Sequence, residues 1–247
     1  MTGTRRRLTA SEMTLRRLHA LLAVQSLVIV LGSVNRLGSL TLGYASSNQF
    51  LRWVDLVNLL PLPILSLVGF YLLKRELETG YGAGRGVEAR WEPSLQLTFV
   101  LGVYLLGAGY GIHEVANYFH TRFCLEEGSA LCRLIVFHDD EFSHWLFFAG
   151  FVMVNASVML LQIVFPYDGQ LRPRDRALIV FNSLFVAAGI FANLAFEEIG
   201  LDLYVVVLLA GVAIYLLRRR GLQPLLLYYS VAYVLGLLLT AGKIALS

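Results

Sequence analysis

Seven long apolar blocks constrain the fold of this chain more than any other feature of its sequence. Each block approaches the roughly 20 residues that an α-helix needs to cross about 30 Å of hydrocarbon. Backbone groups in lipid must form their hydrogen bonds within the segment, so helices are expected. The sequence predicts an all-α, polytopic integral membrane protein with one seven-helix domain over residues 1–247. We place the helices near residues 18–34, 54–73, 95–119, 145–165, 177–196, 201–217 and 222–242.

The charged residues are few and unevenly distributed. They make up only 15% of the chain, whereas about 25% is typical of soluble domains. If the N-terminus is cytoplasmic, the cytoplasmic segments hold every lysine and arginine except Arg36, Arg52, Arg122, Arg133 and Lys243. This bias predicts a multi-pass protein of a cell membrane with its N-terminus in the cytoplasm and its C-terminus outside. Membrane lipids, and no nucleic acid, are the expected partners.

The two cysteines support this orientation. Cys124 and Cys132, in "CLEEGSALC", both fall in the predicted extracytoplasmic loop between the third and fourth helices. An oxidising compartment would allow them to form a disulfide that closes a short loop. Two free thiols are the alternative.

Histidines and carboxylates gather where the third and fourth helices are expected to reach the extracytoplasmic side. In "GIHEVANYFH", the side chains of His113, Asn117 and His120 are spaced i, i+4 and i+7. This spacing places them on one helical face, with Glu114 at its edge. The third helix therefore carries two imidazoles towards a common site.

The stretch "FHDDEFSHWLFF" adds similar residues at the start of the fourth helix. If this stretch is helical from about His138, then Asp140 and His144 are i, i+4 neighbours. Glu141 and His144 are i, i+3 neighbours, and Glu-x-x-His is the spacing by which di-iron bundles direct two ligands inward from one helix. Ser143 lies between these residues.

The fifth helix is expected to end at the same level. Its last turn, "NLAFEEIGLD", contains Asn193 and Glu197 at i and i+4, followed by Glu198. Asp55, at the start of the second helix, is a further candidate. Four remaining acids are interpreted as interfacial side chains solvated by headgroups and water: Asp139, Glu126, Glu127 and Asp202.

A metal site explains this combination of residues. Charges at the edge of the membrane are costly unless they are paired, hydrated or bound to metal. Histidine together with carboxylate suits a divalent metal, with zinc favoured and iron second. The candidate ligands are His113, His120, His138, Asp140, His144, Glu197 and Glu198. The alternatives are a metal-free network that handles protons and a set of unrelated surface residues.

A metal at the extracytoplasmic interface favours an integral membrane hydrolase that acts on a lipid-like or amphiphilic small molecule. Glu141 or Glu114 would be the general base, and Ser143 is a further catalytic candidate. A di-iron membrane oxidoreductase is the first alternative, although only one Glu-x-x-His pair is present where the bundle pattern has two. A non-enzymatic sensor, receptor or metal-binding protein is the second.

Several stretches resemble the heliorhodopsins, a family of seven-helix retinal proteins: "RWEPSL", "GIHEVA", "VNAS" and "PYDGQLRP". The resemblance implies a chromophore lysine midway along the last helix. The only lysine there is Lys243, near the predicted outer end, so photochemistry is not expected. Seven-helix zinc hydrolases of the ceramidase and adiponectin-receptor type offer a functional analogy. Their His-x-x-x-His on the last helix is missing from this sequence.

Overall fold

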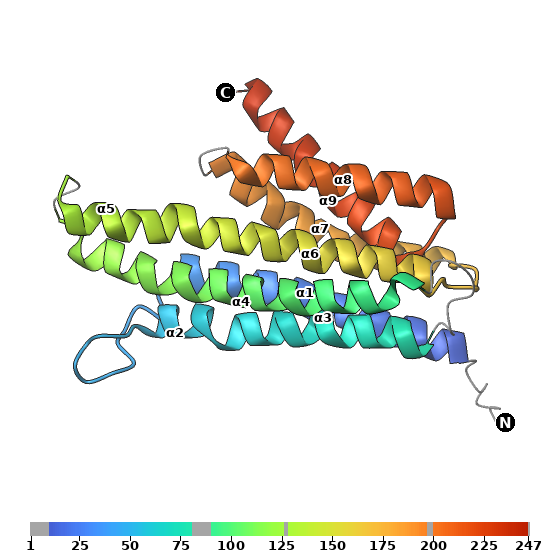
Figure 1. Ribbon diagram of the computed structural model, residues 1–247, viewed down its shortest axis with the longest axis horizontal. Helices are drawn as coiled ribbons and strands as arrows, with labels where there is room; N and C mark the ends of the chain where they lie inside the picture. The colour runs from blue at the N-terminus through green and yellow to red at the C-terminus, as the bar shows by residue number, and fades with distance from the viewer. Residues whose placement is uncertain (1–9, 81–89, 126–127, 197–199, 247) are drawn as a thin grey trace.

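The computed structural model describes residues 10–80, 90–125, 128–196 and 200–246, and these residues are almost entirely helical. Figure 1 shows the helices as a bundle with its long axis horizontal. The elements are α1 (Ala10–Leu37), α2 (Trp53–Leu59), α3 (Pro61–Gly80), α4 (Glu92–Phe123), α5 (Ala130–Val136), the π-helix η2 (Phe137–Phe142), α6 (Ser143–Val164), α7 (Pro173–Phe196), α8 (Leu201–Arg220) and α9 (Pro224–Leu246).

Seven helical segments of the described chain are long and apolar enough to cross a membrane, which confirms the predicted all-α class and number of spans. Two spans are composite, because α2 and α3 together form one and α5, η2 and α6 together form another. Within the described ranges the only β-type pairing is a single bridge between Tyr44 and Arg52. The seven apolar helices indicate a multi-pass membrane protein.

Prolines and one glycine mark the ends of these helices. Pro61, Pro173 and Pro224 are the first residues of α3, α7 and α9. A proline is tolerated there because the first backbone N–H groups of a helix have no intrahelical acceptor. After α8 the chain turns at Gly221, whose φ of 75° lies in the left-handed region that favours glycine.

The prediction for the fourth span was wrong at its N-terminal end. The apolar block suggested a start near residue 145, but the helix begins at Ala130 and continues through η2 into α6. Ser129 caps it, because its side chain accepts a hydrogen bond from the backbone N–H of Cys132. The segment around His138 therefore lies inside a continuous helix and not at its start.

Two spans are longer than a bilayer requires. The span Ala130–Val164 has 35 residues and α4 has 32, whereas α8 has 20. At 1.5 Å per residue the two long spans measure about 52 and 48 Å, roughly 20 Å more than the hydrocarbon thickness. Figure 1 shows the paired ends of α4 and α5 extending past the end of α8. We call this extension the α4–α5 hairpin.

Glycines allow α4 and α6 to pack backbone to backbone. A Cβ atom on Gly109 would lie 2.6 Å from the backbone nitrogen of Phe147, and one on Gly102 would lie 2.8 Å from the Cβ of Met153. Gly150 of α6 faces the backbone of Leu106 in the same way. Close approach at small residues is a common way for membrane helices to associate. This seam fixes the relative positions of the two helices that carry the candidate site.

The first helix is joined to its neighbours by buried polar pairs. Side-chain hydrogen bonds connect α1 to α3, α7 and α2 through Ser66–Gln25 (2.9 Å), Ser26–Asn182 (2.8 Å) and Asn35–Asn58 (2.8 Å). In an apolar environment such pairs satisfy groups that would otherwise be costly to bury. They explain the polar residues that interrupt an otherwise apolar first span.

Candidate functional site

A buried carboxylate, Asp139, lies between two imidazoles in the seam of α4 with η2. Its side chain is only 1% exposed. His120 donates from Nδ1 to Asp139 Oδ2 at 3.0 Å. His113 Nδ1 lies 3.1 Å from Asp139 Oδ1 and 3.3 Å from the Asp139 carbonyl oxygen. One carboxylate thus contacts both histidines that the sequence placed on one face of the third helix.

These contacts assign the protons of the two histidines. The atoms facing each Nδ1 are carboxylate or carbonyl oxygens, which can only accept hydrogen bonds. Nδ1 therefore carries the hydrogen, and Nε2 of each neutral ring is left with a lone pair. His113 is consequently oriented as a base through Nε2, whereas a metal shared between His120 and Asp139 would displace the hydrogen from His120 Nδ1.

A π-helical turn separates the two neighbouring aspartates. Over Phe137–Phe142 the helix widens, and the backbone N–H of Ser143 donates to the His138 carbonyl, five residues back. Asp139 is turned into the seam with α4, whereas Asp140 is exposed. Single π-helical turns inside α-helices are frequent at functional sites.

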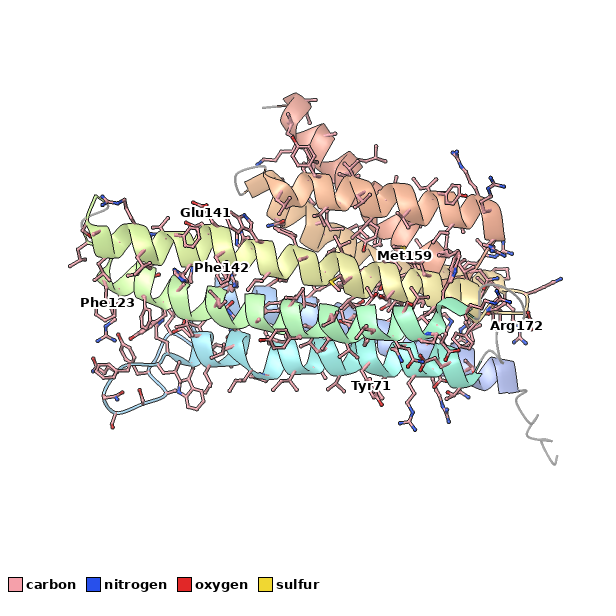
Figure 2. The ribbon with its side chains drawn as sticks, in the orientation of Figure 1. Tyr71, Phe123, Glu141, Phe142, Met159 and Arg172 are labelled. Carbon is pink, nitrogen blue, oxygen red and sulfur yellow. A yellow bond between two sulfur atoms is a disulfide. The ribbon has the colours of Figure 1, made fainter. Side chains whose placement is uncertain are left out.

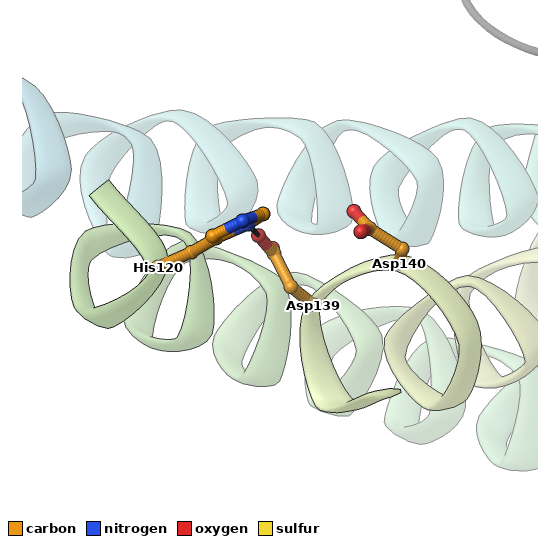
Figure 3. Close-up of side chains that lie close together, drawn as sticks. All are labelled: His120, Asp139 and Asp140. Atoms are coloured by element: carbon orange, nitrogen blue, oxygen red, sulfur yellow. Dashed lines mark hydrogen bonds and ion pairs between the residues drawn. The ribbon is translucent and has the colours of Figure 1, made fainter. Parts of the chain in front are cut away.

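His120, Asp139 and Asp140 could hold a metal ion. Each offers one ligand atom, and these atoms all lie within 4.8 Å of one another. Figure 3 shows the His120 ring meeting the Asp139 carboxylate, with the Asp140 carboxylate to one side. Asp139 Oδ1 is buried and makes no aligned hydrogen bond with the described residues, so it keeps lone pairs for a cation. One imidazole and two carboxylates form a donor set suited to zinc or iron.

A cavity of about 650 Å³ opens beside this group, between the α4–α6 pair and the α7–α8 end of the bundle. Its polar lining comes from six helical elements and includes Arg36, His113, Asn117, Asp140, Glu141, His144, Asn193 and Asp202. Tyr110, Trp145, Phe147 and Phe148 supply an aromatic wall. The His113 and His144 rings lie 5.3 Å apart, centroid to centroid. The volume and mixed lining are typical of small-molecule sites.

Glu114 is not available as a free base. Its side chain is 5% exposed and accepts a hydrogen bond from Arg36 of α1 at 2.5 Å. A buried carboxylate is stabilised by such a cation, and Arg36 in turn reaches the cavity. We therefore assign Glu114 to an ion pair that holds α1 against α4.

Several predicted site residues take other positions. His138 lines a separate apolar groove and donates from Nδ1 to the Leu134 carbonyl at 2.9 Å. Ser143 borders the cavity, but its side chain is fully buried and donates to the Asp139 carbonyl. Asp55 pairs with Arg52 at 2.7 Å, and this hydrogen bond raises the pKa of the arginine. The predicted ligands Glu197 and Glu198 lie outside the described residues.

The predicted disulfide is present. Cys124 and Cys132 are joined, with their Cα atoms 5.0 Å apart. Cys124 follows the last turn of α4, where its backbone N–H donates to the His120 carbonyl, and Cys132 is in the first turn of α5. The disulfide therefore closes the α4–α5 hairpin, and on α4 it lies one helical turn beyond His120.

Asp139 was interpreted from the sequence as a solvated interfacial residue, and this was wrong because the side chain is buried. A helical pattern could have revealed it. Residues 161, 157, 154 and 150 form a buried stripe on α6, and the same spacing continued backwards reaches residues 143 and 139. The apolar block that predicted the fourth helix starts near residue 145, so it did not indicate that the helix extends back to Asp139.

No protein-family model, curated protein or solved structure matches this chain. Its function is therefore argued from the geometry of the site.

Proposed function

We propose that this protein is an integral membrane enzyme that depends on a divalent metal and hydrolyses a lipid-like or amphiphilic substrate. The observation that carries the proposal is the buried Asp139 carboxylate, held between His113 and His120 at the edge of a cavity that is also lined by His144 and by carboxylates. A carboxylate buried in this way is costly, and its position beside a cavity favours a chemical role.

The metal ligands in this proposal are His120, Asp139 and Asp140. Zinc is favoured over iron because three ligands with open positions suit a catalytic zinc site. When bound, the metal would supply Lewis-acid polarisation of a substrate carbonyl. Glu197 and Glu198, which follow α7, remain candidates for further ligands.

His113 is the general base in this proposal. Its Nδ1–H faces Asp139, and the ring lines the cavity, so the Nε2 lone pair can take a proton from water there. Asp139 orients the ring and stabilises the imidazolium that forms, as a carboxylate does for a catalytic histidine in other hydrolases. Glu141, exposed at the cavity, is the second candidate for proton transfer.

The substrate class follows from the position of the cavity. Its lining joins aromatic side chains to charged ones beside the C-terminal end of α7 and the start of α8. An amphiphile could place its polar group near His113 and its apolar part against Trp145, Phe147 and Phe148. The proposal puts this site on the extracytoplasmic side, in keeping with the charge bias along the chain and with the disulfide.

Turnover measurements test the proposal. Purified protein in phosphatidylcholine nanodiscs is assayed with a fluorogenic long-chain ester and the matching amide, before and after metal chelation and zinc replacement. We expect zinc-dependent hydrolysis that falls at least about 100-fold in His113→Gln, because the base is lost. His138→Gln, a histidine outside the cavity, should retain the wild-type rate.

Hydrolysis that survives chelation, or that His113→Gln leaves unchanged, would contradict the proposed enzyme. Oxygen consumption with bound iron would support the oxidoreductase alternative instead. The third outcome is folded protein that binds no metal and hydrolyses neither substrate. That result would identify a metal-free network that handles protons, a reading consistent with both Nδ1 atoms facing Asp139.

A further inference from the structure

A second concave surface lies on the opposite side of the α4–α6 seam from the cavity. This groove measures about 630 Å³ and is lined by α4 on one side and by α5 with η2 on the other. Its lining is Gly111, Ile112, Val115, Ala116, Phe119, Phe123, Leu131, Leu134, Ile135 and His138. His138 is the only polar side chain among them, so the groove suits an apolar occupant.

The groove continues an exposed apolar face of α4. Val115 and Phe119 are exposed, and residues 97, 101 and 104 carry exposed apolar side chains on the same face of α4, at helical spacing. The stripe runs from the apolar middle of the span up into the α4–α5 hairpin. An acyl chain that packs against α4 near residues 97–104 can therefore follow the stripe into the groove.

Exposed apolar residues on the hairpin itself are otherwise unexplained. The hairpin extends past the end of α8 (Figure 1), yet Leu131 and Leu134 are more than half exposed. Figure 2 shows Phe123 and Phe142 near this end of the bundle and Arg172 at the opposite end. Contiguous exposed apolar patches of this kind mark binding surfaces.

His138 gives the groove one polar contact. Its ring is edge-on to Phe137 and Phe142, with centroids 5.4 and 5.9 Å away, and its Nδ1–H is used by the Leu134 carbonyl. The neutral ring therefore keeps Nε2 as an acceptor at the groove. A ligand that satisfies this acceptor must carry a hydrogen-bond donor near its apolar chain.

We propose that the groove between α4 and α5 binds one acyl chain of a membrane phospholipid whose headgroup is a hydrogen-bond donor, such as phosphatidylethanolamine. The chain lies along Ile112, Val115 and Phe119, and the headgroup donates to His138 Nε2. This site is separate from the metal ligands and the cavity, so it does not depend on the proposed enzyme activity.

Photo-crosslinking tests the assignment. The protein is reconstituted in phosphatidylcholine vesicles that contain a small fraction of either phosphatidylethanolamine or phosphatidylcholine with a diazirine in one acyl chain. After illumination, labelled peptides are identified by mass spectrometry. We expect the α4 and α5 peptides to be labelled several-fold more than the α8 peptides, and more by the phosphatidylethanolamine probe.

Two glycines provide a matched pair of variants. A Cβ on Gly111 meets nothing within 4 Å, so Gly111→Leu should fill the groove without disturbing the helix packing. Gly211 of α8 is equally open and exposed, and Gly211→Leu is the control. We expect Gly111→Leu to reduce groove labelling at least several-fold, Gly211→Leu to leave it unchanged, and His138→Phe to remove the preference for phosphatidylethanolamine.

Labelling spread over α4 and α8 in proportion to exposure would overturn the proposal. So would labelling that Gly111→Leu does not reduce, or crosslinks between two copies of the chain across the groove. Thermal unfolding of Gly111→Leu verifies that the variant is folded, and native mass spectrometry of the wild type, showing one retained phospholipid, is the independent measurement.

Discussion

Two adjacent aspartates, Asp139 and Asp140, have opposite environments. Variants of the two can therefore distinguish a residue that also supports the packing from one that only faces the cavity. Asp139 is buried and contacts two imidazoles, whereas Asp140 is exposed beside the cavity. Removing the charge of Asp139 should disturb both the packing of the hairpin and the proposed metal ligands. Removing the charge of Asp140 should disturb only the proposed ligands.

Asp139→Asn should therefore lose metal binding and stability together. Its amide would turn an NH2 group towards one of the two Nδ1–H groups, and an unsatisfied buried donor costs about 1–3 kcal/mol. Asp140→Asn should lose metal affinity while its unfolding temperature stays at the wild-type value. Thermal unfolding followed by tryptophan fluorescence, paired with metal analysis, distinguishes the two. Equal unfolding temperatures for both variants would show that Asp139 is not held as described.

Single residues also show where sequence reasoning was sufficient. The spacing of His113 and His120 correctly predicted a shared face, because helical periodicity is local. The ion pair of Arg36 with Glu114 was not predictable, since it depends on how α1 rotates against α4. Glu114 was therefore predicted as a base from a pattern that does not include its partner.

At the scale of helices, the α4–α5 hairpin positions the site. Its end is closed by the Cys124–Cys132 disulfide, and the chain entering and leaving that closure carries His120 and Asp139. Hydropathy located the seven spans but not the full length of this hairpin, because the charged stretch "HDDE" interrupts the apolar pattern between α5 and α6. Its helical continuation is set by capping and packing instead.

The double variant Cys124→Ser, Cys132→Ser should bind metal more weakly than the wild type. A disulfide across a short loop contributes about 2–3 kcal/mol by restricting the open chain. Without it the hairpin end can separate, and His120 then spends less time near Asp139. Zinc titration with a competing chelator measures the affinity. An unchanged affinity would mean that the glycine seam alone holds the two helices.

The glycine seam has its own test. Gly109→Leu should destabilise the protein by about 1–3 kcal/mol or more, because the new side chain meets the backbone of Phe147. Gly111→Leu, two residues further along α4, faces open space and should not. Thermal unfolding of the two variants in the same nanodiscs gives the comparison. Equal stabilities would contradict the close approach of α4 and α6.

At the scale of the whole molecule, seven membrane-spanning helices predict that the two termini lie on opposite sides of the membrane. The distribution of lysine and arginine predicts that the N-terminus is cytoplasmic. In intact cells, a membrane-impermeant thiol reagent should label Cys124 and Cys132 only after reduction. Labelling that requires permeabilised cells would show that the orientation is opposite to the predicted one and that the site faces the cytoplasm.

Metal stoichiometry tests the central claim most directly. Wild-type protein, His120→Ala and His138→Ala are purified in parallel, equilibrated with zinc and analysed by inductively coupled plasma mass spectrometry. We predict tightly bound metal in the wild type and in His138→Ala, and its loss in His120→Ala. Metal that His120→Ala retains, or a folded wild type that binds none, would contradict a metal site at His120, Asp139 and Asp140.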